Sequence, residues 1–180
     1  MTHCIGTLRI GLGHDIHRLV SGDSIPRDGI SQNGILLGGV RIDHTMSLLG
    51  HSDADVLLHA VTDALLGASG LGDIGELFPD TEPANRNRDS AEMLRTAWTH
   101  VQHDGWHIVN LDIVVFAERP KIAPHKTAIR HRIAELLDID IMQVGLKAKT
   151  GEGIGIIGRE EAVAVQCVVL LMNRNANTVS

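Results

Sequence analysis

The chain has 180 residues, the usual length of one compact domain. Hydrophobic residues make up 43% of it and charged residues 21%, so a wholly disordered protein is excluded. A formal net charge of −6, with two Trp, two Phe and no Tyr, argues against a nucleic-acid partner, which calls for a basic surface or rows of stacking rings.

Two strand patterns open the chain. Residues 7–13 and 35–42 are aliphatic runs punctuated by glycine, and each run predicts one strand. The polar residues 21–34 between them predict a long connection.

A buried helix follows at residues 53–70, where most positions are Ala, Leu or Val at helical spacing. We expect Ser52 or Asp53 to cap its N-terminus and Gly70 to end it. Residues 71–89 hold two prolines and several acids, and they predict a loop beside the functional site.

The second half of the chain continues with two helices and three strands. The periodicity predicts helices at 90–103 and 125–137, and strands at 106–117, 144–149 and 162–172. The last of these is the longest apolar stretch, and it is shorter than the ~20 residues that a membrane helix needs.

This order of elements predicts a single α+β domain, in a mixed α/β arrangement. We expect it to span residues 1–180, with an ordered core at about 7–173. A mixed sheet of four to five strands should carry helices on one face, because each amphipathic element must bury its apolar side. Cys4 and Cys167 are too few and too far apart for a disulfide framework, and no leader is visible, so we expect a cytoplasmic protein.

Asp15 and His17 are the first candidate metal ligands. They stand two positions apart just after the first strand pattern, so an extended backbone would project both from one face. A carboxylate and an imidazole suit zinc, but such a pair is weak evidence by itself, since ordinary surface polarity gives the same pattern.

A polar stripe on the predicted helix strengthens the case. Asp55, His59 and Asp63 recur at every fourth position of an otherwise apolar helix. A solvent face is the alternative interpretation, but Lys, Glu and Gln, which usually fill such faces, are absent between positions 51 and 70. With Asp15 and His17, His59 would complete a three-ligand zinc site, while Asp55 or Asp63 could orient its other nitrogen.

Two further groups are weaker candidates. His51 precedes the helix and could also bind the metal. His100, His103 and His107 form a competing histidine cluster, but no nearby acid completes it, and a solvated surface is the better interpretation.

A glycine-rich stretch near the C-terminus could bring backbone close to phosphate. Residues 147–159 carry Lys147, Lys149, Thr150, Glu152 and Arg159 among the glycines. Neither a P-loop nor a dinucleotide-binding fingerprint is present, so a hairpin remains the alternative.

Five sequence blocks carry a resemblance that spans nearly the whole chain. They are GHDIH (13–17), HSDADVLLH (51–59), LGDIGELFPDT (71–81), ERPKIAPH (118–125) and KAKTGEGIGIIGR (147–159). In this order they resemble the 2-C-methyl-D-erythritol 2,4-cyclodiphosphate synthase family. The resemblance implies a phosphorus-oxygen lyase of the non-mevalonate isoprenoid pathway. Such an enzyme converts 4-diphosphocytidyl-2-C-methyl-D-erythritol 2-phosphate to the cyclic diphosphate and CMP.

The resemblance also implies a role for each block. Asp15, His17 and His59 would bind zinc or another divalent transition metal, and Glu152 would bind Mg²⁺ or Mn²⁺. His51 and Thr150 would stabilise the transition state. The substrate would be held by Asp15, His17, His51, Thr150 and Glu152 together with Ser52, Asp73, Ile74, Gly75, Phe78, Pro79, Asp80, Thr81, Glu82, Ala117, Glu118, Arg119, Pro120, Lys121, Ile122, Ala123, Lys149, Gly151, Ile156 and Arg159.

By the same resemblance the protein should be a homotrimer with active sites between neighbouring subunits. The cytidine pocket would be formed by residues 117–123. The chain departs from the family's usual pattern at Lys149 and Gly151, where threonines are frequent, at Ile156, where an aromatic residue is common, and in the longer segment 21–34.

Two other functions remain open on the sequence. The chain could be a non-catalytic trimeric module that binds zinc and a cytidine nucleotide, having lost turnover through the changes around Lys149. It could also be a zinc phosphohydrolase, in which the open metal position activates water.

Overall fold

One five-stranded sheet forms the centre of the fold. A computed structural model describes residues 7–21, 34–79, 81–85 and 87–173. The strands lie in the order β4-β1-β7-β5-β6, and only the β5–β6 pair in this sheet is parallel. The predicted mixed sheet is therefore confirmed, with β1 (Thr7–Ser21), β4 (Met46–Leu49), β5 (Trp106–Phe116), β6 (Val144–Lys149) and β7 (Ala162–Asn173).

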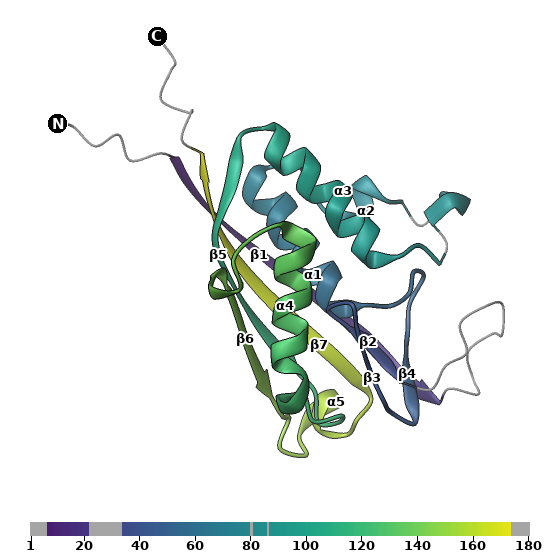
Figure 1. The fold of residues 1–180 in the computed structure, drawn as a ribbon. Coiled ribbons are helices and arrows are strands. Elements are labelled where there is room, and N and C mark those ends of the chain that lie inside the picture. The colour runs from purple at the N-terminus through teal and green to yellow at the C-terminus, as the bar shows by residue number, and fades with distance from the viewer. Residues whose placement is uncertain (1–6, 22–33, 80, 86, 174–180) are drawn as a thin grey trace, which may run out of the picture.

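Three long helices cover one face of this sheet (Figure 1). They are α1 (Val56–Ser69), α3 (Ser90–His103) and α4 (Lys126–Leu137), close to the predicted bounds. Shorter turns of helix lie in the connections: α2 (Ile74–Leu77), η2 (Pro83–Asn85), η3 (Ala123–His125), η4 (Ile141–Gln143) and α5 (Gly155–Gly158). The segment predicted as a loop at 71–89 thus contains α2 and η2, and the glycine-rich stretch contains α5. No helix in the described part of the chain is long and apolar enough to cross a membrane.

The prediction of a single strand at 35–42 is wrong. β2 (Ile35–Leu37) and β3 (Val40–Ile42) instead form a hairpin of their own. Gly38 and Gly39 make the turn with φ of 64° and 73°, a region where a side chain would be strained. Most of the predicted connection at 21–34 falls outside the described residues.

α1 begins later than predicted, because Asp55 is its N-cap rather than Ser52 or Asp53. The Asp55 carboxylate accepts the N–H groups of Leu57 and Leu58. It also accepts those of Gly38 at 2.8 Å and Gly39 at 2.6 Å, which ties the β2–β3 turn to the helix. Gly70 ends the helix in the left-handed conformation, as predicted.

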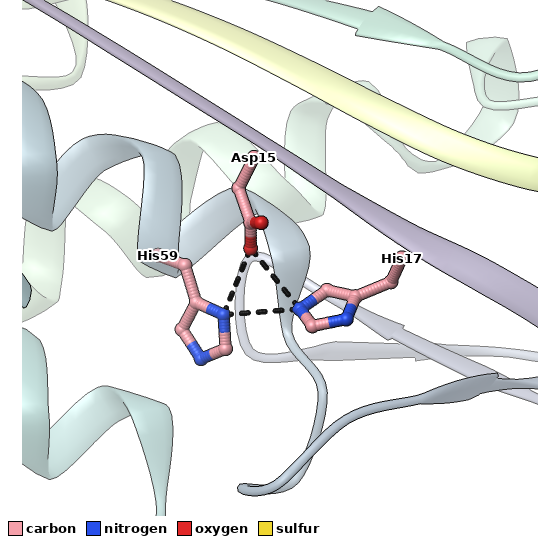
Figure 2. A group of neighbouring side chains, drawn as sticks. All are labelled: Asp15, His17 and His59. Carbon is pink, nitrogen blue, oxygen red and sulfur yellow. Dashed lines mark hydrogen bonds and ion pairs between the residues drawn. The ribbon is translucent and has the colours of Figure 1, made fainter. Parts of the chain in front are cut away.

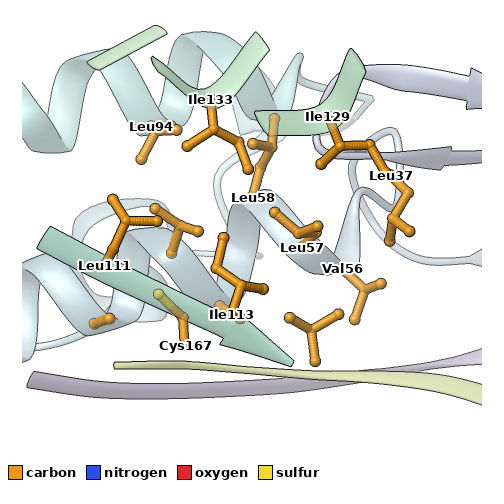
Figure 3. Close-up of a cluster of buried hydrophobic side chains, with 14 of the residues drawn as sticks. Leu37, Val56, Leu57, Leu58, Leu94, Leu111, Ile113, Ile129, Ile133 and Cys167 are labelled. Atoms are coloured by element: carbon orange, nitrogen blue, oxygen red, sulfur yellow. The ribbon is translucent and has the colours of Figure 1, made fainter. Parts of the chain in front are cut away.

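The core fills the space between the sheet and the helices (Figure 3). Leu57 and Leu58 from α1, Ile113 from β5 and Ile129 from α4 meet there, all essentially inaccessible to solvent. The opposite face of β1 is different, since its alternate residues Leu8, Ile10, Leu12 and Ile16 are exposed. The sheet thus has one covered face and one open apolar face.

Candidate metal and substrate site

The first strand and the first helix bring the three predicted zinc ligands together. β1 continues to Ser21, so Asp15 and His17 lie within the strand rather than after it. Their spacing places both side chains on the helix-covered face. His59, in the first turn of α1, points toward both side chains from the helix (Figure 2).

The three ligand atoms converge on one point. Asp15 Oδ2 lies 3.0 Å from His17 Nε2 and 3.0 Å from His59 Nδ1, and the two histidine nitrogens are 3.2 Å apart. A tetrahedral zinc with metal–ligand bonds of about 2.0–2.1 Å separates its ligand atoms by roughly 3.3 Å. One carboxylate and two imidazoles at these separations fit a divalent transition metal.

This is the only such group that the described residues bring together. His100 and His103 lie in the last turn of α3, where both are exposed. This exposure agrees with the prediction that the histidines around 100–107 form a solvated surface.

Each histidine is oriented through its other ring nitrogen. His17 Nδ1 lies 2.8 Å from the Leu49 carbonyl oxygen of β4. Because a carbonyl only accepts, this nitrogen carries the proton, and the neutral ring keeps the Nε2 lone pair for a metal. His59 Nε2 lies 3.0 Å from Ser52 Oγ and 2.9 Å from Ser90 Oγ.

The hypothesis that Asp55 or Asp63 orients His59 is therefore wrong, since serines fill that position. Asp55 caps α1, as described above, and Asp63 accepts the N–H of Ile74 at 2.9 Å. Ser90 was not among the predicted residues. It lies 31 residues from His59 in the chain and reaches this histidine only because α3 packs beside α1.

Burial and pairing shift the pKa values of the ligands in opposite directions. Burial alone would raise the pKa of Asp15, but hydrogen bonds from His17 and His59 hold it well below its usual range. Burial alone would lower the pKa of His17, but the hydrogen bond and charge of Asp15 raise it. The lowered pKa keeps Asp15 an ionised carboxylate, which is the form that binds a cation.

The predicted substrate-binding residues 73–75 and 78–82 follow α1, and the start of this segment is anchored to the helix. Asp73 caps α2 by accepting the N–H of Glu76, while Asp63 of α1 holds Ile74. Phe78 is buried, with the Arg88 guanidinium 4.7 Å from its ring centroid. Asp80 lies outside the described residues.

The predicted cytidine and diphosphate residues form a second group at the ends of β5 and β6. The Ala117 N–H donates to the Lys149 carbonyl at 3.0 Å, and the Gly151 N–H donates to the Glu118 carboxylate at 3.0 Å. The Thr150 hydroxyl donates to Glu152. These contacts join the two predicted blocks into one unit.

Within one chain, this second group is distant from the metal group. Asp15 pairs with Val165, Val165 with Val115, and Val115 with Ala148. The row crosses three strand spacings of about 4.8 Å, or ~14 Å between backbones. The strands that carry the two groups run parallel to one another, so both groups lie toward the same end of the sheet.

The fold and site together define a class of protein, a single-domain α+β protein with a carboxylate–imidazole group between a strand and a helix that could hold a metal ion. Residues 8–172 match the model of the YgbB family, and the chain belongs to this family.

The similar proteins of known name are cyclodiphosphate synthases. The chain is 52% identical over 163 residues to the 2-C-methyl-D-erythritol 2,4-cyclodiphosphate synthase of Bordetella pertussis, covering 91% of this chain and 94% of that protein. It is 50% identical over 165 residues to the same synthase from Pseudomonas putida, covering 92% and 99%. The resemblance found in the five sequence blocks is thereby confirmed.

Solved structures agree. The CDP complex of IspF from Plasmodium falciparum matches with a TM-score of 0.79 and 36% identity, covering 94% of this chain and 99% of that one. The bifunctional IspDF from Campylobacter jejuni matches with a TM-score of 0.85 and 42% identity, covering 93% of this chain. This chain spans only 43% of that bifunctional protein.

Proposed function

We propose that this protein is an enzyme of the non-mevalonate isoprenoid pathway that converts 4-diphosphocytidyl-2-C-methyl-D-erythritol 2-phosphate to 2-C-methyl-D-erythritol 2,4-cyclodiphosphate and CMP. The observation that carries the proposal is the convergence of Asp15, His17 and His59 in a chain about half identical to such synthases over nearly its whole length. The CDP complex of a similar structure supports a cytidine nucleotide as part of the substrate.

The reaction is an internal displacement at phosphorus. An oxygen of the 2-phosphate attacks the β-phosphorus, a new phosphorus–oxygen bond closes the ring, and the bond to the CMP oxygen breaks. The attacking phosphate is already anionic at neutral pH, so no protein nucleophile is needed. The protein's task is to neutralise charge and to hold a folded-back substrate in line.

A metal ion held by the three ligands would neutralise charge on one side of the diphosphate. Asp15, His17 and His59 would hold Zn²⁺ or another divalent transition metal, which supplies a Lewis acid and a template for phosphoryl oxygens. His51 and Ser52 directly precede α1, and the Ser52 hydroxyl already lies next to His59. This position supports a contact between Ser52 and a phosphate oxygen at the metal.

The residues at the ends of β5 and β6 would neutralise the charge on the other side of the diphosphate. We assign the Glu152 carboxylate to Mg²⁺ or Mn²⁺, with the Thr150 hydroxyl beside it. Residues 117–123 and 149–152 are joined by the Glu118–Gly151 hydrogen bond, which favours one continuous pocket for cytidine and diphosphate. Arg159 is exposed beside Glu161, and it could exchange this partner for a phosphate.

We also propose that the protein works as a homotrimer with active sites between subunits. Leu8, Ile10 and Leu12 are each at least half exposed on the open face of the sheet, which supports burial against other copies. The backbones of the strands that carry the metal group and the cytidine group of one chain lie ~14 Å apart. This separation further favours a site completed by a neighbouring subunit. We infer a cytoplasmic location from the cysteine pattern alone.

The test is turnover of the named substrate, followed by phosphorus NMR and by CMP release. We expect a ring diphosphate and CMP in equal amounts, lost on chelation and in His59→Ala. Open-chain phosphates would identify a zinc phosphohydrolase instead. Tight CMP binding without any turnover would identify a non-catalytic binding module.

A further inference from the structure

Ser90 contacts the candidate metal site, although its position in the sequence does not indicate this. A serine at the start of a helix usually caps it, but here Asp89 is the N-cap of α3 and accepts the N–H of Ala91. The Ser90 side chain is free for another role. Its hydroxyl is fully buried and lies 2.9 Å from His59 Nε2.

Asp53 determines which way this hydroxyl points. One Asp53 carboxylate oxygen accepts the Ser90 hydroxyl, and the other accepts the Ser90 backbone N–H at 3.1 Å. An ionised carboxylate can only accept, and a hydroxyl has a single hydrogen to donate. The Ser90 oxygen therefore turns its lone pairs toward His59.

The consequence reaches the metal-binding nitrogen. A hydroxyl that only accepts favours the ring proton on His59 Nε2. In the absence of a metal ion, Asp15 Oδ2, which lies 3.0 Å from Nδ1, competes for the ring proton; a ring held in the Nε2–H form has no hydrogen on Nδ1, which also lies 3.2 Å from His17 Nε2. The lone pair of Nδ1 is directed to the point where the ligand atoms converge.

We propose that Ser90 and Asp53 are positioning residues that hold His59 in its Nε2–H tautomer, with Nδ1 presented to a divalent transition metal. This inference rests on the proposed metal site, and it adds two residues that lie outside the ligand set. Asp53 lies just before α1 and Ser90 is the first residue of α3, so their hydrogen bonds join the two helices. The same contact fixes the His59 ring against α3.

Ser52 does not duplicate this role. Its hydroxyl also lies 3.0 Å from His59 Nε2, but it accepts the Ala54 N–H at 3.2 Å and is only partly buried. It is the serine that we assign to the substrate. Ser90 is the partner that stays in place while Ser52 turns toward a phosphate.

The test compares Ser90→Ala and Asp53→Asn with a matched control, Ser69→Ala. Ser69 is also a buried serine, and its hydroxyl donates to carbonyls within α1, away from the ligands. Zinc affinity is measured by chelator competition on the purified protein. The tautomer of His59 is read from nitrogen-15 NMR of the metal-free protein at a pH where the ring is neutral.

We expect a larger Nε2–H fraction in the unaltered protein than in either variant, with Asp15 competing for the ring proton at Nδ1. Ser90→Ala should mix the two tautomers and weaken zinc binding by about 10- to 100-fold, the usual effect of losing a ligand's outer partner. In Asp53→Asn the side-chain amide can donate to Ser90, which then donates to His59, so the Nδ1–H form should increase. Ser69→Ala should change neither measurement.

Unchanged zinc affinity and an unchanged Nε2–H fraction in both variants would overturn the inference. If the unaltered protein binds no zinc, the proposed metal site fails. The tautomer measurement would still decide the role of Ser90, because it needs no metal.

Discussion

Gly13 of β1 lies directly beneath Ala60 of α1. A Cβ atom at Gly13 would be only 1.9 Å from the Ala60 carbonyl oxygen, a distance that real Cβ contacts do not reach. Gly11 makes the same approach one turn further along, against Ala64. These two glycines let the helix backbone rest on the strand, and so bring His59 within 3.0 Å of Asp15.

Gly13→Ala should therefore separate α1 from β1. We expect a loss of roughly 1–3 kcal/mol or more in the free energy of unfolding, since overpacking forces backbone to move. Zinc affinity should fall as well, because His59 moves with the helix. Urea unfolding and chelator competition measure the two effects.

Gly67→Ala is the control for this substitution. Gly67 is exposed in the same helix and a Cβ there meets nothing within 4 Å, so alanine should stabilise the protein by up to about 1 kcal/mol. Equal stability and equal zinc affinity of the Gly13→Ala and Gly67→Ala variants would contradict the close-packing argument.

The residue pattern was sufficient to predict that Asp15, His17 and His59 come together, but not which residues orient the histidines. The polar positions of an otherwise apolar helix singled out His59, and alternation along a strand paired Asp15 with His17. Ser90 could not be predicted, since its role depends on how α3 packs beside α1, and its position looks like a helix cap.

Similar limits apply to the fold. The long helices follow from apolar spacing, and α3 begins and ends where the periodicity predicts. The β2–β3 hairpin was missed because residues 35–42 read as one apolar run, although the adjacent Gly38 and Gly39 are a recognised two-residue turn signal. Asp55 looked like part of a polar stripe, but its carboxylate caps α1 and holds that turn.

Asp63 provides a prediction about pH. Burial raises the pKa of this carboxyl, and the nearby charges of Asp73 and Asp15 add to the effect, although the Ile74 N–H partly opposes it. A carboxyl with a raised pKa in the folded state stabilises the fold below its usual pKa and loses that contribution as pH rises through the folded value. At neutral pH, the ionised Asp63 carboxylate therefore destabilises the folded state.

Asp63→Asn removes that charge and keeps an oxygen to accept the Ile74 N–H. We expect the variant to be more stable than the unaltered protein at pH 7, by less than about 1 kcal/mol because solvent screens a half-buried group. The gain should shrink on acidification and vanish below the usual pKa of the carboxyl. Thermal melts across this pH range would measure it, and a lower Tm of the variant at pH 7 would contradict the argument.

Metal binding should be visible in stability as well as in activity. A ligand that binds only the folded state stabilises it by about 2.7 kcal/mol at a concentration 100 times its Kd. We expect Zn²⁺ to raise the Tm of the unaltered protein and to leave that of His59→Ala unchanged. His100→Ala removes an exposed histidine of α3 and should respond to zinc like the unaltered protein. A zinc response retained by His59→Ala would show that the ion binds elsewhere.

The open face of the sheet yields a prediction about assembly. Ile10 is 73% exposed in the single chain, among Leu8 and Leu12 on β1. If this face packs against two other copies, Ile10→Asp would bury charges without partners near the contact and should convert trimers to monomers. Light scattering coupled to size-exclusion chromatography measures the mass directly.

Met142→Asp is the matched control for assembly. Met142 lies on η4 and is 82% exposed, so it presents as much apolar surface to solvent as Ile10 does. It lies directly before the edge strand β6 rather than on the open face of β1, so its replacement should leave the trimer intact. Loss of cyclising activity together with trimer dissociation in Ile10→Asp, but not in Met142→Asp, would connect assembly to catalysis, as expected if a neighbour's cytidine group completes the site. A fully active Ile10→Asp monomer would instead place both groups of one chain in a single working site, despite the ~14 Å between their strands.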